Sequence, residues 1–204
     1  MNKKVIWITS GLVALGLIVF LAYALAGEEP PDPGIAFRDV TVDGANLPAF
    51  AQGVTDTSVG TRAPEISGTD WDGNAVTIGA DGRPKLVIGL AHWCQFCQAE
   101  VPEIVDWVNG GGLPDDVDLY AVTIMSDHTR TRWPPQEWLE DEGWNSIPVL
   151  MDSRTAAAQF AYGASATPFY LVLDGENRVI GRSTGRIGIA GLEAFIALAR
   201  AGLD

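Results

Sequence analysis

One apolar run constrains the fold most, because it ends abruptly in the only two cysteines of the chain. Residues 85–90 show no alternation of polar and apolar side chains, which is typical of a strand buried on both faces. Cys94 and Cys97 follow, and apolar side chains then recur at helical spacing over 96–108. A run of glycines at 110–112 ends that pattern. The sequence predicts a buried strand, a dithiol and an amphipathic helix in immediate succession.

A Cys-x-x-Cys pair closes too short a loop to stabilise a fold, so its ordinary uses are redox chemistry or half of a zinc site. Zinc needs two more ligands, and the chain offers only His92 and His128, so we predict no metal site. At a strand-to-helix junction, Cys94 lies at the helix N-terminus, where free N–H groups favour a thiolate. Cys97, one turn later, faces inward. We predict that Cys94 is the nucleophile, that Cys97 resolves the mixed disulfide, and that their redox-active disulfide needs no other cofactor.

The N-terminus has the composition of a membrane anchor. Residues 5–26 carry no charged side chain and are long enough to cross a hydrocarbon core of about 30 Å. Lys3 and Lys4 precede this segment and acidic residues follow it, which orients the N-terminus toward the cytoplasm. We predict a single-pass protein of the cell membrane with an extracytoplasmic globular part. A small-x-small pattern before Gly27 leaves a cleaved signal and secretion as the alternative.

Composition separates the remaining classes of function. The chain has 204 residues, 47% of them hydrophobic, which suits one globular domain with an extension. Its net charge of −13 argues against nucleic-acid binding, which requires a basic surface. We expect the anchor or signal at 1–26, a linker and N-terminal extension at 27–59, and the globular domain at 60–204. Within the extension we expect a short strand at 37–42 and a loop packed by Leu47, Phe50 and Val54.

Strand and helix patterns alternate along the domain. After a hairpin at 62–78 and the strand, dithiol and helix described above, the expected elements are a strand at 117–125, a helix at 134–143, a strand at 149–151, a helix at 155–162, a hairpin at 169–182 and a helix around 192–199. This order implies an α/β fold with a three-layer sandwich and a mixed central sheet.

Several motifs between residues 60 and 204 stand in the order of a known family. They are Gly60-x-x-Ala63-Pro64, Asp72-Gly73, Ala91-His92-Trp93-Cys94-Gln95-Phe96-Cys97, Glu100-Val101-Pro102 and Ala166-Thr167-Pro168-Phe169. Together they resemble the thioredoxin-like superfamily, specifically its extracytoplasmic, membrane-anchored TlpA/ResA and redoxin-type thiol–disulfide oxidoreductases. The resemblance implies the thioredoxin-like form of the three-layer sandwich.

The resemblance also implies roles for individual residues. Pro168 follows a cis peptide bond and shapes the substrate-binding groove, while Thr167 presents its backbone to the substrate. Glu100 exchanges a proton with Cys97, directly or through water; the alternative is a solvated helix charge. Trp93 packs beside the nucleophile. Gln95 and Phe96 complete the set of predicted substrate-binding residues. We expect this dipeptide between the cysteines also to influence the redox potential.

Some features depart from the family or lie outside it. Ile88 occupies the position at which cytoplasmic thioredoxins have a buried aspartate, so Glu100 is the one acid–base candidate of this kind. We expect His92 to be a partly exposed loop residue; thiolate stabilisation and metal binding are the alternatives. His128 is expected at the surface. Three tryptophans in the inserted region are expected to pack the core, with a docking surface as the alternative: Trp133, Trp138 and Trp144.

The predicted function is reduction, or oxidation and isomerisation, of disulfides in exported proteins. Its partners are protein thiols and disulfides and a membrane protein that donates or accepts electrons. A copper-binding module of the Sco type is the alternative, although that family has one more residue between its cysteines. A peroxidase is disfavoured, because Ala91 stands where peroxiredoxins have a threonine.

Overall fold

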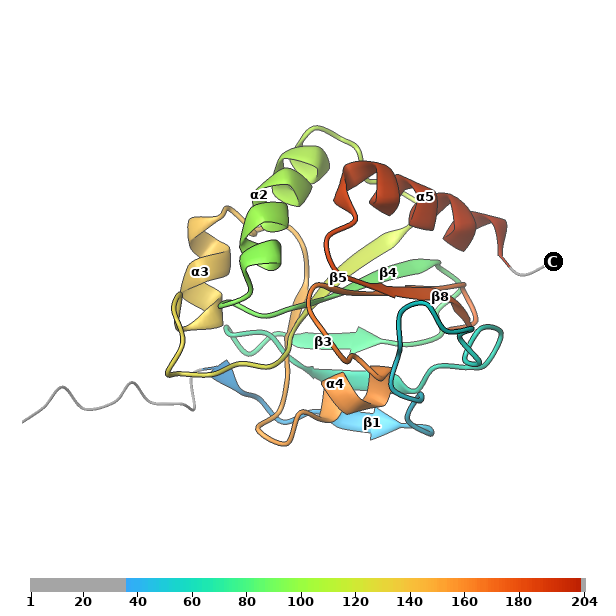
Figure 1. Ribbon diagram of the computed structural model, residues 1–204, viewed down its shortest axis with the longest axis horizontal. Coiled ribbons are helices and arrows are strands. Elements are labelled where there is room, and N and C mark those ends of the chain that lie inside the picture. Colours follow the sequence, from blue (N-terminus) through green and yellow to red (C-terminus); the bar gives the residue numbers. More distant parts are fainter. Residues whose placement is uncertain (1–35, 203–204) are drawn as a thin grey trace, which may run out of the picture. The chain divides into compact units, whose positions relative to one another are not determined.

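A five-stranded mixed sheet forms the middle layer of the computed structural model, which describes residues 36–202. Its strands are β4 (Lys85–Leu90), β5 (Asp118–Thr123), β6 (Val149–Met151), β7 (Phe169–Leu173) and β8 (Val179–Thr184). They lie in the order β6-β5-β4-β7-β8 (Figure 1). The central strand β4 runs parallel to β5 and antiparallel to β7. The predicted mixed sheet is therefore confirmed, with the predicted buried strand in its centre.

Helices cover the two faces of this sheet unequally (Figure 1). The helices in the described part of the chain are α2 (Gln95–Asn109), α3 (Pro135–Asp141), α4 (Ala157–Tyr162) and α5 (Gly188–Ala201). In the core, α2, α3 and α5 pack on one face, against Leu86, Ile88 and Leu90 of β4. Val87 points to the other face, where α4 packs. Alternate residues of one strand thus anchor two separate cores, which is why the whole of β4 is apolar.

The predicted N-terminal hairpin belongs to a second sheet, separate from the five-stranded one. The strands β1 (Thr41–Asp43), β2 (Glu65–Thr69) and β3 (Ala75–Ile78) form an antiparallel sheet in that order. It contributes to the same core cluster as α4. The strand expected at 37–42 is displaced toward the C-terminus, because the backbone N–H of Arg38 donates to Asp152 O (3.1 Å) after β6. Only the later residues pair with β2.

The extension before the domain packs onto it through a loop. Leu47 is buried and Phe50 is half-buried, with its ring against that of Phe169 at 6.4 Å between centroids. Val54 was expected to pack as well, and this is wrong: it is 67% exposed. A local turn, in which the Val54 N–H donates to Ala51 O (3.3 Å), directs the chain outward there.

A buried arginine clamps this loop to the sheet. The guanidinium of Arg182, on β8, donates to both carboxylate oxygens of Asp56 (2.6 and 2.8 Å). It also donates to Pro48 O (2.8 Å) and Tyr162 O (3.1 Å). Since the Arg182 side chain is almost fully buried, Asp56 is its counter-ion in a region largely closed to water.

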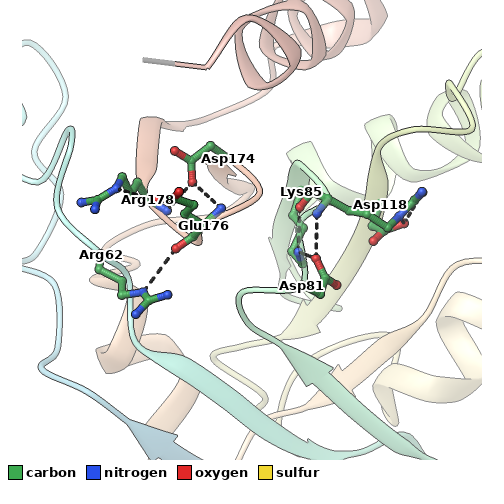
Figure 2. A network of polar contacts seen from close by, with 8 residues as sticks. Arg62, Asp81, Lys85, Asp118, Asp174, Glu176 and Arg178 are labelled. Atoms are coloured by element: carbon green, nitrogen blue, oxygen red, sulfur yellow. Dashed lines mark hydrogen bonds and ion pairs between the residues drawn. The ribbon is translucent and has the colours of Figure 1, made fainter. Parts of the chain in front are cut away.

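Ion pairs and polar turns close the other end of β4, away from the cysteines. Figure 2 shows the ammonium group of Lys85, a fully buried side chain, donating to Asp81. Burial raises the pKa of Asp81, but the Lys85 hydrogen bond and the Arg83 N–H outweigh it and lower the pKa overall. Nearby, the Arg62 guanidinium donates to Glu176 O (3.2 Å) in the β7–β8 turn. Charge pairing therefore stabilises this end of β4, and the cysteines follow its other end.

Within residues 36–202, no helix is long and apolar enough to cross a membrane. The predicted anchor or signal at 1–26 and the first part of the predicted linker lie outside the described residues.

The buried clamp predicts a selective loss of stability. Asp56→Asn leaves the buried Arg182 guanidinium without its counter-ion and should lower the free energy of unfolding by about 3 kcal/mol at neutral pH. The matched control is Asp116→Asn, which removes the partner of the exposed Arg200 (2.8 Å) and should cost less than about 1 kcal/mol. Urea denaturation measures both.

The same clamp predicts a pH dependence. Because the Arg182 hydrogen bond lowers the pKa of Asp56 against the effect of burial, the stability that this ion pair contributes is lost below about pH 4. The difference in free energy of unfolding between wild type and Asp56→Asn should therefore narrow below this pH. Equal losses of stability in Asp56→Asn and Asp116→Asn at neutral pH would contradict the clamp.

Candidate active site

The dithiol lies where β4 gives way to α2. A turn in which the Cys94 N–H donates to Ala91 O (3.0 Å) ends the strand. Cys94 is the N-cap of α2, and its carbonyl accepts the first helical hydrogen bond, from the N–H of Gln98 (3.0 Å). This confirms the predicted succession of strand, dithiol and helix. Cys94 therefore has the unpaired N–H groups of the first helical turn close to it.

The two thiols are in unequal surroundings. Both cysteines are free; Cys94 is 7% exposed and Cys97 is fully buried. Burial raises the pKa of the Cys97 thiol far above its ordinary value, and a backbone hydrogen bond at Ala91 opposes this only in part. Cys97 therefore keeps its proton at neutral pH unless a base removes it. The difference agrees with the predicted roles of an attacking Cys94 and a resolving Cys97.

The loop before β7 meets Cys94 from the opposite side. The Thr167–Pro168 peptide bond is cis, as the resemblance implied, and the Cys94 thiol donates to Thr167 O at 3.4 Å. Antiparallel pairing of Phe169 with Gly89 brings this loop to the end of β4. A Cβ at Gly89 would lie 3.2 Å from the Phe169 Cβ and 2.8 Å from Ile124 Cδ1, so the close approach requires glycine.

The rim around Cys94 is aromatic and exposed. Phe96 is 61% exposed and Gln95 is exposed beside it. Trp93 is half-buried; its indole N–H donates to Met125 O (2.8 Å), and the guanidinium of Arg130 lies 5.2 Å from its ring centre. The three aromatic and amide side chains predicted to bind substrate flank the nucleophile in the sequence, and their role in binding stays a prediction.

Glu100 is fully buried, which rules out a solvated helix charge. One carboxylate oxygen accepts the backbone N–H groups of Ile187 (3.0 Å) and Gly188 (2.7 Å) at the start of α5. The other oxygen accepts the hydroxyl of Tyr170 on β7. Glu100 lies one helical turn after Cys97 on α2, and its role as the proton partner of that thiol stays a prediction.

Tyr170 was missed in the reading of the sequence. It is a fully buried tyrosine within the apolar run of β7. The available signal was its hydroxyl, which needs a partner when a strand is buried on both faces. The first turn of α5 was missed as well, because nothing in its local sequence points to a carboxylate from α2.

The expectation of a partly exposed His92 is wrong. Its ring is buried under the loop that follows β5: Nδ1 hydrogen-bonds Thr131 O (2.7 Å), and Nε2 accepts the Asp127 N–H (3.2 Å). The first contact requires a proton on Nδ1 and the second requires none on Nε2, so the ring is neutral. Burial also lowers the pKa of His92. With both nitrogens engaged, His92 is not free to bind a metal, which disfavours the copper alternative.

The predictions for the three tryptophans and for His128 have different outcomes. Trp138 and Trp144 are buried in the core cluster that contains α2, which confirms core packing. Trp133 is half-buried, with its ring centre 5.6 Å from that of His92. His128 is exposed, as expected. Among residues 36–202, no three His, Cys, Asp or Glu side chains come together in a way that could hold a metal ion.

Solved structures share this fold. A DsbF homologue from Corynebacterium diphtheriae superposes with a TM-score of 0.59 at 17% identity, covering 75% of this chain and 99% of its own. A putative thiol:disulfide interchange protein DsbE from Chlorobium tepidum gives 0.57 at 17% identity, with coverages of 69% and 96%. StoA from Bacillus subtilis gives 0.51 at 16% identity, with coverages of 61% and 90%. These likenesses establish the thioredoxin-like α/β fold.

Sequence comparison identifies the family. No functionally curated protein matches the chain. The Redoxin family model matches residues 58–194, which include the dithiol, Glu100 and the cis proline. The chain therefore belongs to the Redoxin family and has the thioredoxin-like fold.

Proposed function

We propose that this protein is a membrane-tethered, extracytoplasmic enzyme that exchanges disulfides with exported proteins. The observation that carries the proposal is the unequal burial of the two thiols at the start of α2, with the Thr167 carbonyl against the outer one. A single-thiol or structural cysteine pair would need neither feature. Proteins of the same fold that are named thiol:disulfide interchange proteins support exchange with protein substrates.

The exchange follows from the geometry. The Cys94 thiolate attacks one sulfur of a substrate disulfide, forms a mixed disulfide and releases the other substrate sulfur as a thiolate. Cys97 then gives its proton to Glu100, directly or through water, and attacks Cys94 Sγ. The Cys94–Cys97 disulfide forms as the second substrate thiolate leaves, so the enzyme loses two electrons and the substrate gains them. Run in reverse, the same steps oxidise a substrate dithiol.

The substrate is proposed to be an extended protein segment held along the rim. The cis Thr167–Pro168 loop offers backbone groups beside Cys94, and Phe96 offers an exposed apolar surface on the other side. Backbone contacts of this kind tolerate many sequences, whereas an aromatic contact favours apolar side chains near the disulfide.

Cysteine variants test the assignment of roles. Cys94→Ser should abolish reduction of insulin disulfides, because the buried Cys97 cannot reach a substrate disulfide. Cys97→Ser should instead accumulate mixed disulfides, since nothing resolves them. Non-reducing gels followed by identification of the trapped partners in cells measure this. Full activity of Cys94→Ser would overturn the assignment of the nucleophile.

The direction of electron flow is proposed to be toward the substrate, with a membrane partner that restores the dithiol. A fully buried Cys97 disfavours a charged reduced form, and a reduced form that is not stabilised makes the dithiol a good reductant. Equilibration with glutathione mixtures should therefore give a potential near that of thioredoxin, about −270 mV, and not near that of a strong oxidant at about −120 mV. A value at the oxidising end would assign oxidation or isomerisation instead.

The tether is proposed from the uncharged segment at residues 5–26. The full chain should fractionate with membranes and resist extraction by high salt, because insertion is hydrophobic and not electrostatic. A chain that begins at Gly27 is the control and should be soluble. An externally added, membrane-impermeant thiol reagent should reach Cys94 in intact cells. A full chain recovered as a shorter soluble protein would indicate cleavage before Gly27.

A further inference from the structure

We propose that Tyr170 is a positioning residue for this exchange: together with the first turn of α5, its hydroxyl holds the buried Glu100 carboxylate in the ionised form that can accept the proton of Cys97. The inference rests on the proposed function, because it concerns the step in which Cys97 resolves the mixed disulfide. It adds a residue on β7 and a helix terminus far along the chain to the site formed by α2.

The location of Tyr170 follows from strand register. It pairs with Ile88 of β4, the strand that leads into the dithiol. Tyr170, Cys97 and α2 share one core cluster on the same face of the sheet. Its ring is fixed by Phe195 of α5, at 6.3 Å between centroids. The hydroxyl is therefore held in one place within the core, where it contacts Glu100.

The hydrogen bonds at Glu100 match an ionised carboxylate. Two backbone N–H groups donate to one oxygen, and a hydroxyl donates to the other. The two N–H groups can only donate and the Tyr170 hydroxyl is oriented as a donor here, so an ionised carboxylate, which only accepts, satisfies all three partners. The N–H groups come from the start of α5, where the helix dipole places partial positive charge. A protonated Glu100 could donate only to the Tyr170 oxygen, and that hydroxyl would then have to turn its own hydrogen to another acceptor.

Tyr170 keeps its proton, so it acts as a donor and does not take part in proton transfer. Burial first, and then the hydrogen bond to Glu100, raise the pKa of its hydroxyl well above the ordinary value. The other ionisable groups around the carboxylate are Cys97 on α2 and Arg186 before α5. Arg186 is paired with Glu103 at the half-exposed rim, so its charge is largely balanced there. Tyr170 and the α5 N-terminus are thus the direct contacts that oppose desolvation of Glu100.

The hydrogen-bond donors around Glu100 meet a requirement of the resolution step, in which this carboxylate must be able to accept a proton. Desolvation favours neutral forms, so a buried carboxylate without donors would bind a proton and could not accept one from Cys97. With the donors in place, Glu100 is charged before the step and neutral after it, while the Cys97 thiol becomes the attacking thiolate. In the reverse direction the protonated Glu100 returns its proton to Cys97. Loss of the Tyr170 hydroxyl should therefore slow resolution and shift its pH dependence.

The test is Tyr170→Phe in the full chain, with single-turnover kinetics against oxidised glutathione followed by tryptophan fluorescence. Attack by Cys94 is second order and resolution by Cys97 is first order, so the two steps separate. We expect resolution at pH 7 to slow about tenfold and the acidic limb of its pH–rate profile to move about one unit to higher pH. Attack by Cys94 should stay within about twofold of wild type.

Tyr162→Phe is the matched control. It removes another buried hydroxyl, one without a hydrogen-bond partner, from α4 on the opposite face of the sheet. Its pH–rate profile should coincide with that of wild type. In a Glu100→Gln background, Tyr170→Phe should change resolution less than about twofold, because the residue acts through Glu100. An unshifted profile in Tyr170→Phe, or full slowing in the Glu100→Gln background, would overturn the inference.

Two further outcomes keep the inference separate from folding and from the proposed function. If Tyr170→Phe does not fold, the infrared difference between wild type and Glu100→Gln at pH 7 decides: a band of an ionised carboxylate supports the inference, and a protonated-acid band overturns it. If wild type itself shows no disulfide exchange, the proposed function fails first. If wild type exchanges normally and only the Tyr170→Phe profile is unshifted, the inference alone fails.

Discussion

Burial of β4 on both faces fixes the position of the dithiol, and the other parts of the site are arranged around the end of this strand. The strand β4 lies between β5 and β7, and α2 begins within a few residues of its end. This junction places Cys94 at the N-cap and Cys97 inside the core. The antiparallel register of β7 then brings the Thr167–Pro168 loop to the same end of the sheet.

The same burial creates the electrostatic problem of the site. The Cys97 thiol and the Glu100 carboxylate, the proposed donor and acceptor of the proton, both lie out of reach of bulk water. The fold compensates with donors from elements that arrive late in the chain, the Tyr170 hydroxyl and the first N–H groups of α5. The C-terminal helix is therefore both a cover for the sheet and part of the environment of Glu100.

Elements with a clear local signal, either a period or an unbroken apolar run, were predicted correctly. The strand at 149–151 and the strand at 85–90 have the expected bounds, and the helix after the dithiol and the final hairpin match closely. Errors arose where the chain has no such signal and an individual contact, local or distant, decides the path. Val54 turns outward through a local hydrogen bond, the first strand shifts because Arg38 pairs beyond β6, and His92 is covered by a loop that begins more than thirty residues later.

The sequence by itself determined the α/β sandwich with a mixed sheet, the place of the two cysteines at a strand-to-helix junction and the presence of Glu100 one turn later, because spacing along a strand and a helix decides which side chains share a face. Its motifs added the thioredoxin-like form of that sandwich through their resemblance to a known family. Only the tertiary structure decided what those side chains meet. The donors to Glu100 lie 70, 87 and 88 residues away in the sequence, and the partners of His92 lie 35 and 39 residues away. Local periodicity encodes that a group is buried, but the hydrogen-bond partner that makes its burial tolerable comes from whichever distant element the packing brings beside it.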